Sequence, residues 1–186
     1  MSDVLEIKPY DPRWAADFEQ ERARLEKSLG TLAVRIEHNG STSVPGLSAK
    51  PVIDIQISVR RLHPIDLYAG RLVELGYVHV LHPDDALAPF FHRPETWPHT
   101  HHIHVVAADG EEESKTLAFR DYLRDHDAVA REYESLKKDL APRYSSSHFE
   151  TREAYAEAKS DFIARITRQA LAEGYPRKSP LKPATE

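Results

Sequence analysis

Alternating apolar and polar positions predict two neighbouring strands in the first third of the chain. In the segment AVRIEHN, residues 33–39, every second residue faces the same way, with Ile36 on the more apolar side. In VIDIQISV, residues 52–59, four β-branched residues occupy one face and Asp54 lies at the centre of the other. Each strand therefore offers one face to a hydrophobic core and keeps one polar face.

Helical spacing and one further strand account for most of the remaining chain. A first helix is expected between Asp11, a plausible N-cap ahead of Pro12, and Gly30, which can end it. The segment HHIHVVA, residues 101–107, reads as a third strand that ends at an Asp-Gly pair. Further helices are predicted over residues 64–75, 113–125, 127–140 and 151–173, and a short strand over residues 77–81.

These elements predict one α+β domain with a mixed or antiparallel sheet and flanking helices. The domain is expected to span residues 1–174, with a helical part over about residues 111–174. Residues 175–186, YPRKSPLKPATE, contain three prolines and no periodicity, so a disordered tail is predicted there.

Composition narrows the classes of function. The 186 residues carry a net charge of −5, which argues against general nucleic-acid binding because that needs a basic surface. The absence of cysteine excludes disulfides, thiolate metal sites and cysteine nucleophiles. The first residues contain no signal-peptide core and no stretch is apolar enough to span a membrane, so a cytoplasmic protein is expected.

A glycine and two hydroxyl residues follow the first predicted strand. At Gly40-Ser41-Thr42, backbone N–H groups and small hydroxyls can approach a phosphate closely. Asp54 lies on the next strand and would face the same space, where a carboxylate could hold a divalent cation. A plain hairpin with a polar loop and a solvent-facing aspartate fits the same pattern, and the spacing alone does not separate the two readings.

Five segments, taken in order, resemble the GrpB-like family. They are PYDPRWAADFEQERARL, RIEHNGSTSVPGLSAKPVIDIQISV, HIHVV, FRDYLRDH and YAEAKSDFI, and together they span roughly residues 8–166. That family is assigned by fold to the nucleotidyltransferase superfamily. The resemblance therefore implies a nucleotidyltransferase-like mixed sheet with flanking helices and a helical C-terminal part.

The resemblance also implies roles for particular residues. Gly40 and Ser41 match the Gly-Ser pair that binds the triphosphate in nucleotidyltransferases, and Asp54 matches the first of the metal-binding carboxylates. The second carboxylate position holds Gln56, whose amide is a neutral, weak ligand. The strand expected to supply a third carboxylate carries His102 and His104 instead. The resemblance thus implies the fold more strongly than it implies the two-metal reaction, which needs several carboxylates.

The leading interpretation is a protein that binds a nucleotide or another phosphorylated small molecule together with a divalent metal, with nucleotidyl transfer to a small molecule as its reaction. Asp54 is the predicted catalytic residue and a metal ligand, joined in the metal shell by His102 and His104. The phosphate-binding candidates are Gly40, Ser41, Thr42, Lys50, Arg120, Arg124 and Lys159. Magnesium is the expected ion, with manganese or zinc as alternatives because imidazole suits transition metals better.

Two other functions stay open from the sequence. Gln56 favours a non-catalytic ligand-binding or interaction module of the same fold, which kept the site and lost the second acid. The closely spaced histidines favour a histidine–metal hydrolase, in which Asp54, His102 and His104 would form a triad of ligands. Neither the substrate nor the oligomeric state follows from the sequence.

Overall fold

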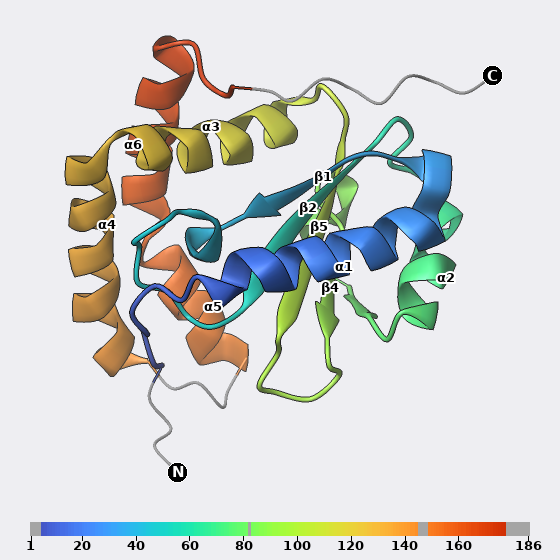
Figure 1. Cartoon of the computed structure of the whole chain (residues 1–186), viewed down its shortest axis with the longest axis horizontal. Helices are drawn as coiled ribbons and strands as arrows, with labels where there is room; N and C mark the ends of the chain where they lie inside the picture. The colour runs from blue at the N-terminus through green and yellow to red at the C-terminus, as the bar shows by residue number, and fades with distance from the viewer. Residues whose placement is uncertain (1–4, 82, 145–148, 178–186) are drawn as a thin grey trace.

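The computed structural model describes residues 5–81, 83–144 and 149–177. At its centre is a five-stranded sheet with the order β1-β2-β5-β4-β3 (Figure 1). The strands are β1 (Ala33–Asn39), β2 (Ile53–Val59), β3 (Val78–Val80), β4 (Phe90–Arg93) and β5 (His101–Ala107). β2 and β5 are parallel and the other neighbours are antiparallel, so the sheet is mixed, as predicted.

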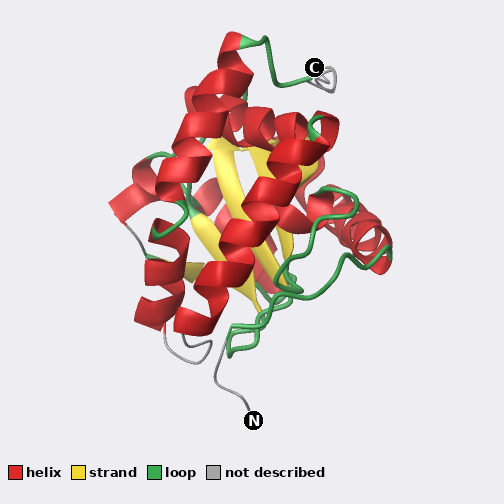
Figure 2. Ribbon diagram, turned by 90° about the vertical axis from the view of Figure 1, so that its left-hand side faces the viewer, coloured by secondary structure: helices red, strands yellow, loops and turns green. Residues whose placement is uncertain are grey.

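Helices cover both faces of the sheet, as Figures 1 and 2 show from two sides. The helices are α1 (Arg13–Leu29), α2 (Asp66–Glu74), α3 (Glu111–Asp125), α4 (Asp127–Leu140), α5 (Phe149–Glu157) and α6 (Ser160–Ala172). α1 and α2 pack on one face, and α3 packs on the other, where α4 and α6 extend the helical part. The arrangement confirms the predicted α+β fold with a helical C-terminal part.

The main core lies between α1, α2 and the apolar face of the sheet. Phe18 and Leu25 of α1 are buried against Ile55 and Ile57 of β2, which are at most 1% exposed. The start of α1 is held by Asp11, whose Oδ1 accepts a hydrogen bond of 2.9 Å from the backbone N–H of Arg13. The alternation read from the sequence therefore places this face of β1 and β2 correctly.

The opposite face of the sheet is polar, and α3 contacts part of it through a buried ion pair. Arg35 of β1 donates two hydrogen bonds, of 2.9 and 2.8 Å, to the carboxylate of Glu113 in α3. Their side chains are 4% and 0% exposed. Asp109, in the turn before α3, also accepts from Arg35 at 2.8 Å. This contact holds α3 against β1 near Arg35. The other end of the β1–β2 pair, where Asn39 is paired with Asp54, lies outside this contact.

The prediction of a single helix over residues 151–173 is wrong, because the chain forms two helices with a break at residues 158–159. The two helices have different partners. Tyr155 of α5 is buried against Leu140 and Leu5, whereas Ile166 of α6 is buried against α3. The chain changes direction to serve both clusters, and Lys159 lies at that change.

The first residues of the predicted tail contact α3. The Tyr175 hydroxyl donates a hydrogen bond of 2.7 Å to Asp125, and the Arg177 backbone N–H donates one of 3.0 Å to Asp121. Residues 178–186, on which the rest of that prediction falls, lie outside the described part of the chain.

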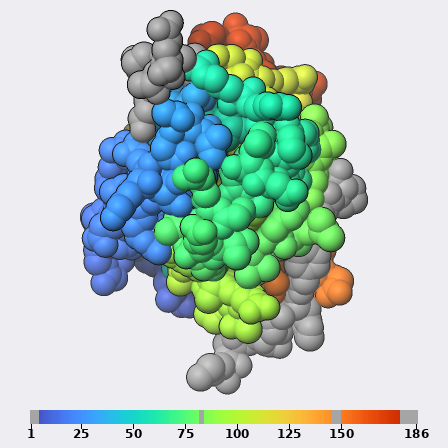
Figure 3. Space-filling model, turned by 90° about the vertical axis from the view of Figure 1, so that its right-hand side faces the viewer, coloured from blue at the N-terminus to red at the C-terminus, as the bar shows by residue number. Residues whose placement is uncertain are grey.

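The side of the molecule seen in Figure 3 is formed by α1 in blue and the segment with α2, β3 and β4 in teal to green. Four large apolar side chains of the segment with α2, β3 and β4 are exposed, namely Leu67, Val73, Leu81 and Leu87. Within residues 5–81, 83–144 and 149–177, no helix has both the length and the apolar character needed to cross a bilayer.

Removal of Glu113 tests the buried ion pair. Glu113→Ala leaves the Arg35 guanidinium buried with Asp109 alone, so the free energy of unfolding is expected to fall by about 3 kcal/mol. Urea denaturation measures this change. The matched control is Glu132→Ala, which breaks an exposed pair with Arg165 and should cost less than about 1 kcal/mol. Equal effects of the two substitutions would show that the buried pair does not hold α3.

Candidate functional site

The polar face of the sheet brings the predicted site residues together in two rows that run across the strands. Directly paired residues of neighbouring strands lie side by side on the same face. The first row is Asn39, Asp54, His102 and His92, and the second is Glu37, Gln56, His104 and Phe90. Asp54 therefore has a histidine beside it on β5, as the sequence predicted.

Gly40 ends β1 and lies directly against Asp54. Its φ of 64° and ψ of −172° are accessible to glycine and strained for other residues. A Cβ atom at this position would lie 2.8 Å from both Cβ and Cγ of Asp54. The close approach of the backbone to the carboxylate thus requires glycine here, and it sets where Asp54 points.

Asp54 is next to His102, which in turn contacts His99. His102 Nδ1 lies 3.4 Å from Asp54 Oδ1, and its Nε2 lies 3.1 Å from Nδ1 of His99. Burial alone raises the pKa of Asp54, but the hydrogen bond and charge of His102, with the charge of Lys50, hold that pKa below its usual value. The Asp54 side chain is still 33% exposed. It is therefore an ionised carboxylate that a ligand can reach.

Two lysines from distant parts of the chain lie near Asp54. The Nζ atoms of Lys50 and Lys159 lie 5.3 and 4.1 Å from the centre of the buried Tyr155 ring. Burial and, to a smaller extent, the charge of Lys50 lower the pKa of Lys159 to about 7, against the opposing effect of Asp54. Burial likewise lowers the pKa of Lys50, against the effect of Asp54. The break between α5 and α6 is what brings Lys159 here.

A third lysine, Lys137, lies within electrostatic reach of Lys159. Lys137 of α4 is 2% exposed and donates a hydrogen bond to the Ser48 carbonyl in the loop between β1 and β2. Burial, with a smaller contribution from the charge of Lys159, lowers its pKa to about 7. We name Gly40, Ser41, Lys50, Asp54, His102 and Lys159 the Asp54 site. This site contains one carboxylate, that of Asp54, and two lysine amino groups, those of Lys50 and Lys159.

The two hydroxyls of the Gly-Ser-Thr turn have different surroundings. Ser41 is partly exposed and hydrogen-bonded to Tyr133 of α4. Thr42 is 1% exposed, and its hydroxyl donates a hydrogen bond of 3.2 Å to the Val52 carbonyl and lies 3.0 Å from His38 Nε2. The turn therefore presents Ser41 at the surface, whereas Thr42 points inward and holds the loop.

Both predicted arginines are used to brace the fold. Arg120 is buried and donates to Glu37 at 2.9 Å and to the His38 carbonyl at 3.0 Å. Arg124 donates two hydrogen bonds, of 3.0 and 2.9 Å, to the Ser43 carbonyl. These contacts tie α3 to β1 and to the turn after it.

Gln56, at the second carboxylate position, is covered by α3. It is 0% exposed, and its Oε1 accepts a hydrogen bond from the Thr116 hydroxyl. Beside it, the carboxylate of Glu37 is paired with Arg120. The second row therefore offers no accessible acid next to Asp54.

The three ligands predicted for a transition metal do not form one cluster. Among the described residues, no three histidine, aspartate or glutamate side chains are arranged to hold one ion. The register explains this, because Asp54 is opposite His102 while His104 is opposite Gln56, one row further along. His104 is exposed and packs on Phe90 at 4.9 Å between ring centres.

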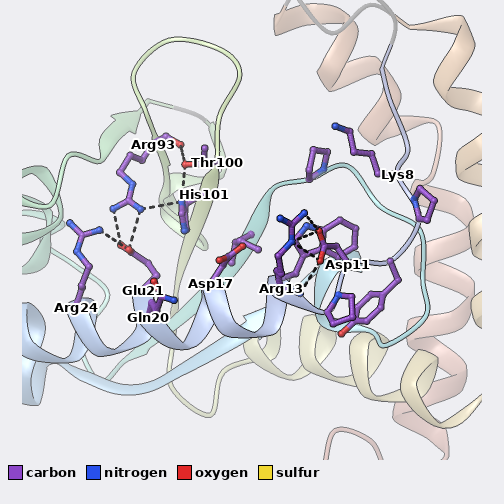
Figure 4. Close-up of a pocket in the computed structure, with 16 residues that line it drawn as sticks. Lys8, Asp11, Arg13, Asp17, Gln20, Glu21, Arg24, Arg93, Thr100 and His101 are labelled. Carbon is purple, nitrogen blue, oxygen red and sulfur yellow. Dashed lines mark hydrogen bonds and ion pairs between the residues drawn. The ribbon is translucent and has the colours of Figure 1, made fainter.

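A groove of about 860 Å³ lies on the other face of the sheet, along α1 (Figure 4). Arg93 lines it and donates hydrogen bonds of 3.0 and 3.1 Å to Glu21. Glu21 also accepts from Tyr77 and Arg24, at 2.9 and 2.7 Å. The buried carboxylate is fully occupied by these donors, so the groove is separate from the Asp54 site in both place and chemistry.

Comparison with known proteins identifies the family. The family model described as "GrpB protein" matches residues 4–169. The chain belongs to the GrpB family. A UPF0157 protein of Pseudomonas aeruginosa is 37% identical over 173 residues, which cover 91% of this chain and 69% of that protein. The crystal structure of the conserved protein GrpB from Enterococcus faecalis is 33% identical, with a TM-score of 0.76, and covers 90% of this chain and 98% of that one.

A relative with lower identity to this GrpB chain is named after an enzyme activity. A Mycobacterium leprae protein named dephospho-CoA kinase is 28% identical over 187 residues. The match covers 86% of this chain and 45% of that protein.

Three residues of the surroundings were missed by the sequence analysis. Tyr133 and Tyr155 are buried in the helical part, and they contact Ser41 and the two lysines. Lys137 follows Tyr133 by four positions, so it interrupts the apolar stripe of its helix. A charged residue on an apolar stripe was the one signal available in the sequence.

Two glycines allow a direct test of the contact between Gly40 and Asp54. Gly40 and Gly46 both have positive φ, but an added Cβ meets Asp54 at Gly40 and open space at Gly46. Gly40→Ala is therefore expected to lower the free energy of unfolding by about 1–3 kcal/mol more than Gly46→Ala, because it adds overpacking to backbone strain. Urea denaturation of both variants gives the difference. A difference near zero would mean that Asp54 moves aside freely.

Proposed function

We propose that this GrpB protein binds a nucleotide or another phosphorylated small molecule, together with one divalent cation, at the Asp54 site. The observation that carries the proposal is the charge around Asp54. Lys50 and Lys159 lie on one buried tyrosine, and burial and mutual repulsion hold the pKa of Lys159 down to about 7. A phosphate group supplies the negative charge that these ammonium groups lack.

The turn at the end of β1 supports the phosphate part of the proposal. Gly40 brings the backbone close to Asp54 without a side chain, and Ser41 is partly exposed beside it. Backbone N–H groups in such turns, with a small hydroxyl, suit phosphate oxygens. In the proposed complex Gly40 and Ser41 bind phosphate oxygens, and Lys50 and Lys159 offset their charge. Thr42, Arg120 and Arg124 keep this turn in place.

The residues present fit one magnesium ion shared with the ligand. Magnesium usually takes one or two carboxylates, phosphate oxygens of the substrate and several waters. Asp54 supplies one accessible carboxylate, and Gln56 and Glu37 are covered or paired. This donor set does not fit a pair of ions held by protein carboxylates. Asp54 would hold the cation, whose positive charge would polarise the P–O bonds of a bound phosphate.

Nucleotidyl transfer to a small molecule is the reaction that we propose for this site. Asp54 would orient an acceptor hydroxyl toward the α-phosphorus of the bound nucleotide. The hydroxyl oxygen forms the new P–O bond, pyrophosphate leaves with the electrons of the broken bond, and the hydroxyl proton passes to solvent. Lys50 and Lys159 would stabilise the charge on the leaving pyrophosphate.

A non-catalytic ligand-binding module is the second candidate. The burial of Gln56 under Thr116 favours it, since the position that holds the second acid in a two-metal site is closed here. The two candidates share the ligand and differ in turnover. Release of pyrophosphate from a bound nucleoside triphosphate, with a panel of small hydroxyl compounds, separates them.

Ligand-dependent thermal unfolding tests the site. ATP, CTP and dephospho-CoA, the last because of the relative named dephospho-CoA kinase, are each added with magnesium or EDTA. A ligand at 100 times its Kd stabilises by about 2.7 kcal/mol, or roughly 5–10 °C for a chain of this size. The shift should require magnesium and should be lost in Asp54→Asn and Lys159→Ala.

The matched control for that experiment is Lys138→Ala. Lys138 lies next to Lys137 on α4 but is 55% exposed and paired with Glu134. Its removal changes the net charge of the protein as Lys159→Ala does, without touching the Asp54 site. A ligand shift that survives in Lys159→Ala, or one that is lost equally in Lys138→Ala, contradicts the proposal.

The lowered pKa of Lys159 predicts how binding depends on pH. Lys159 lies near Lys50, Lys137 and Asp54 and has a pKa of about 7. Above pH 7, its side chain is therefore uncharged in most protein molecules. A bound phosphate raises that pKa, so binding above pH 7 takes up a proton. Affinity should therefore fall between pH 7 and 9, by up to about tenfold per pH unit for one coupled proton.

Lys159→Arg provides the comparison, because arginine keeps its charge throughout this range. In this variant the dependence of affinity on pH should flatten. Titration calorimetry in two buffers of different ionisation enthalpy measures the proton uptake directly. No proton uptake by the unmodified protein at pH 8 would show that Lys159 does not meet the ligand.

A further inference from the structure

A group of flat side chains continues from Asp54 toward the loop between β4 and β5. His99 is in contact with His102, and the Trp97 ring lies edge-on to His99 with 5.1 Å between ring centres. The Arg152 guanidinium of α5 lies 4.4 Å from the centre of the Trp97 ring. The group therefore connects the Asp54 site to a tryptophan at the meeting point of the sheet and the helical part.

The imidazole rings are ordered by their own contacts. His92 and His99 are stacked, with 3.8 Å between ring centres and 8° between planes, and His92 Nδ1 lies 2.9 Å from the Pro94 carbonyl. His99 is thus held between His92 and His102, and it supports one edge of Trp97. Trp97 itself is only partly buried, in contrast to the buried Trp14. A rigid, partly exposed indole is a surface on which an aromatic ring can stack.

Arg152 adds charge to this surface. It lowers the pKa of Lys50 and of His99 through its charge, which places it within electrostatic reach of both the phosphate-binding lysines and the histidine stack. A guanidinium plane can stack on a heterocycle as it does on an indole. Trp97 and Arg152 therefore offer two flat groups at one end of a site whose other end holds the ammonium groups.

We propose that Trp97 and Arg152 bind the base of a nucleotide whose phosphates lie at the Asp54 site. This rests on the proposed function and extends it, because it selects nucleotides over other phosphorylated small molecules. The base stacks on the Trp97 ring, either beside the Arg152 guanidinium or in place of it. His99 keeps the indole in place from the edge.

The chain contains two tryptophans, Trp14 and Trp97, which permits a direct optical test. In Trp14→Phe, Trp97 is the only source of tryptophan emission. This variant is titrated with ATP, CTP or inorganic tripolyphosphate, each with magnesium, and free tryptophan corrects for absorption by the nucleotides. The nucleotides should quench Trp97 to saturation, whereas tripolyphosphate should bind without changing the emission.

A second variant tests the stacking energy and does not depend on the first. Trp97→Leu should weaken ATP binding by about 5- to 150-fold, since stacking of one base contributes about 1–3 kcal/mol. Its affinity for tripolyphosphate should stay the same, and Trp97→Phe should recover most of the affinity for ATP. Calorimetry on the full chain measures all three.

The outcomes separate this proposal from the one on which it rests. If neither ATP nor tripolyphosphate binds the unmodified protein, both proposals are overturned. If both ligands bind, and Trp97→Leu leaves ATP affinity unchanged or weakens both ligands equally, the base site is overturned while the phosphate site stands. In that case the contact between Trp97 and Arg152 serves only to hold α5 against the loop.

Discussion

The strict alternation of side chains on β1, β2 and β5 is the constraint on which the rest of the structure depends. It sends Ile55 and Ile57 to the core under α1 and leaves Asp54 and Gln56 on the opposite face. Because β2 and β5 are paired in parallel, the same alternation places His102 beside Asp54. A shift of one residue in either register would bury the polar set in the core, so the site and the core hold each other in place.

Burying the polar face of the sheet without hydrogen-bond partners would cost free energy. α3 covers only the part of this face to which its own side chains can bond. Glu113 pairs with Arg35, Thr116 with Gln56, and Arg120 with Glu37. Each contact gives these polar groups a partner within the fold, as burial requires, except that Gln56 Nε2 is buried without one. In the first row, Asp54 and His102 lie 3.4 Å apart and remain partly exposed, at 33% and 18%. The division between structural and functional polar groups therefore follows the edge of α3.

The strands, the α4 stripe and the position of Asp54 could be predicted because they depend on local spacing. The roles of the charged residues could not, since their partners are remote in sequence. Arg120 shares a predicted helix face with Arg124, but its acceptors, Glu37 and the His38 carbonyl, lie 83 and 82 positions away. Thr42 and Ser41 are neighbours of the same chemical type, and only the folded loop sends one inward. Lys159 reaches the site because the helix predicted over residues 151–173 breaks beside it.

The loss of the second acid and the presence of the lysines are two parts of one electrostatic arrangement. In a two-metal site, carboxylates hold cations and the cations hold phosphates. Here Gln56 carries no charge, so a second divalent ion would have no counter-charge from the protein. Lys50 and Lys159 instead bring two amino groups close to Asp54, without carboxylates to hold them. An ammonium group can neutralise phosphate oxygens but cannot activate a hydroxyl as a metal-bound ligand. Under the proposed function, this arrangement favours tight binding of phosphates over fast transfer, and any transfer chemistry would depend on Asp54 and the single cation that it would hold.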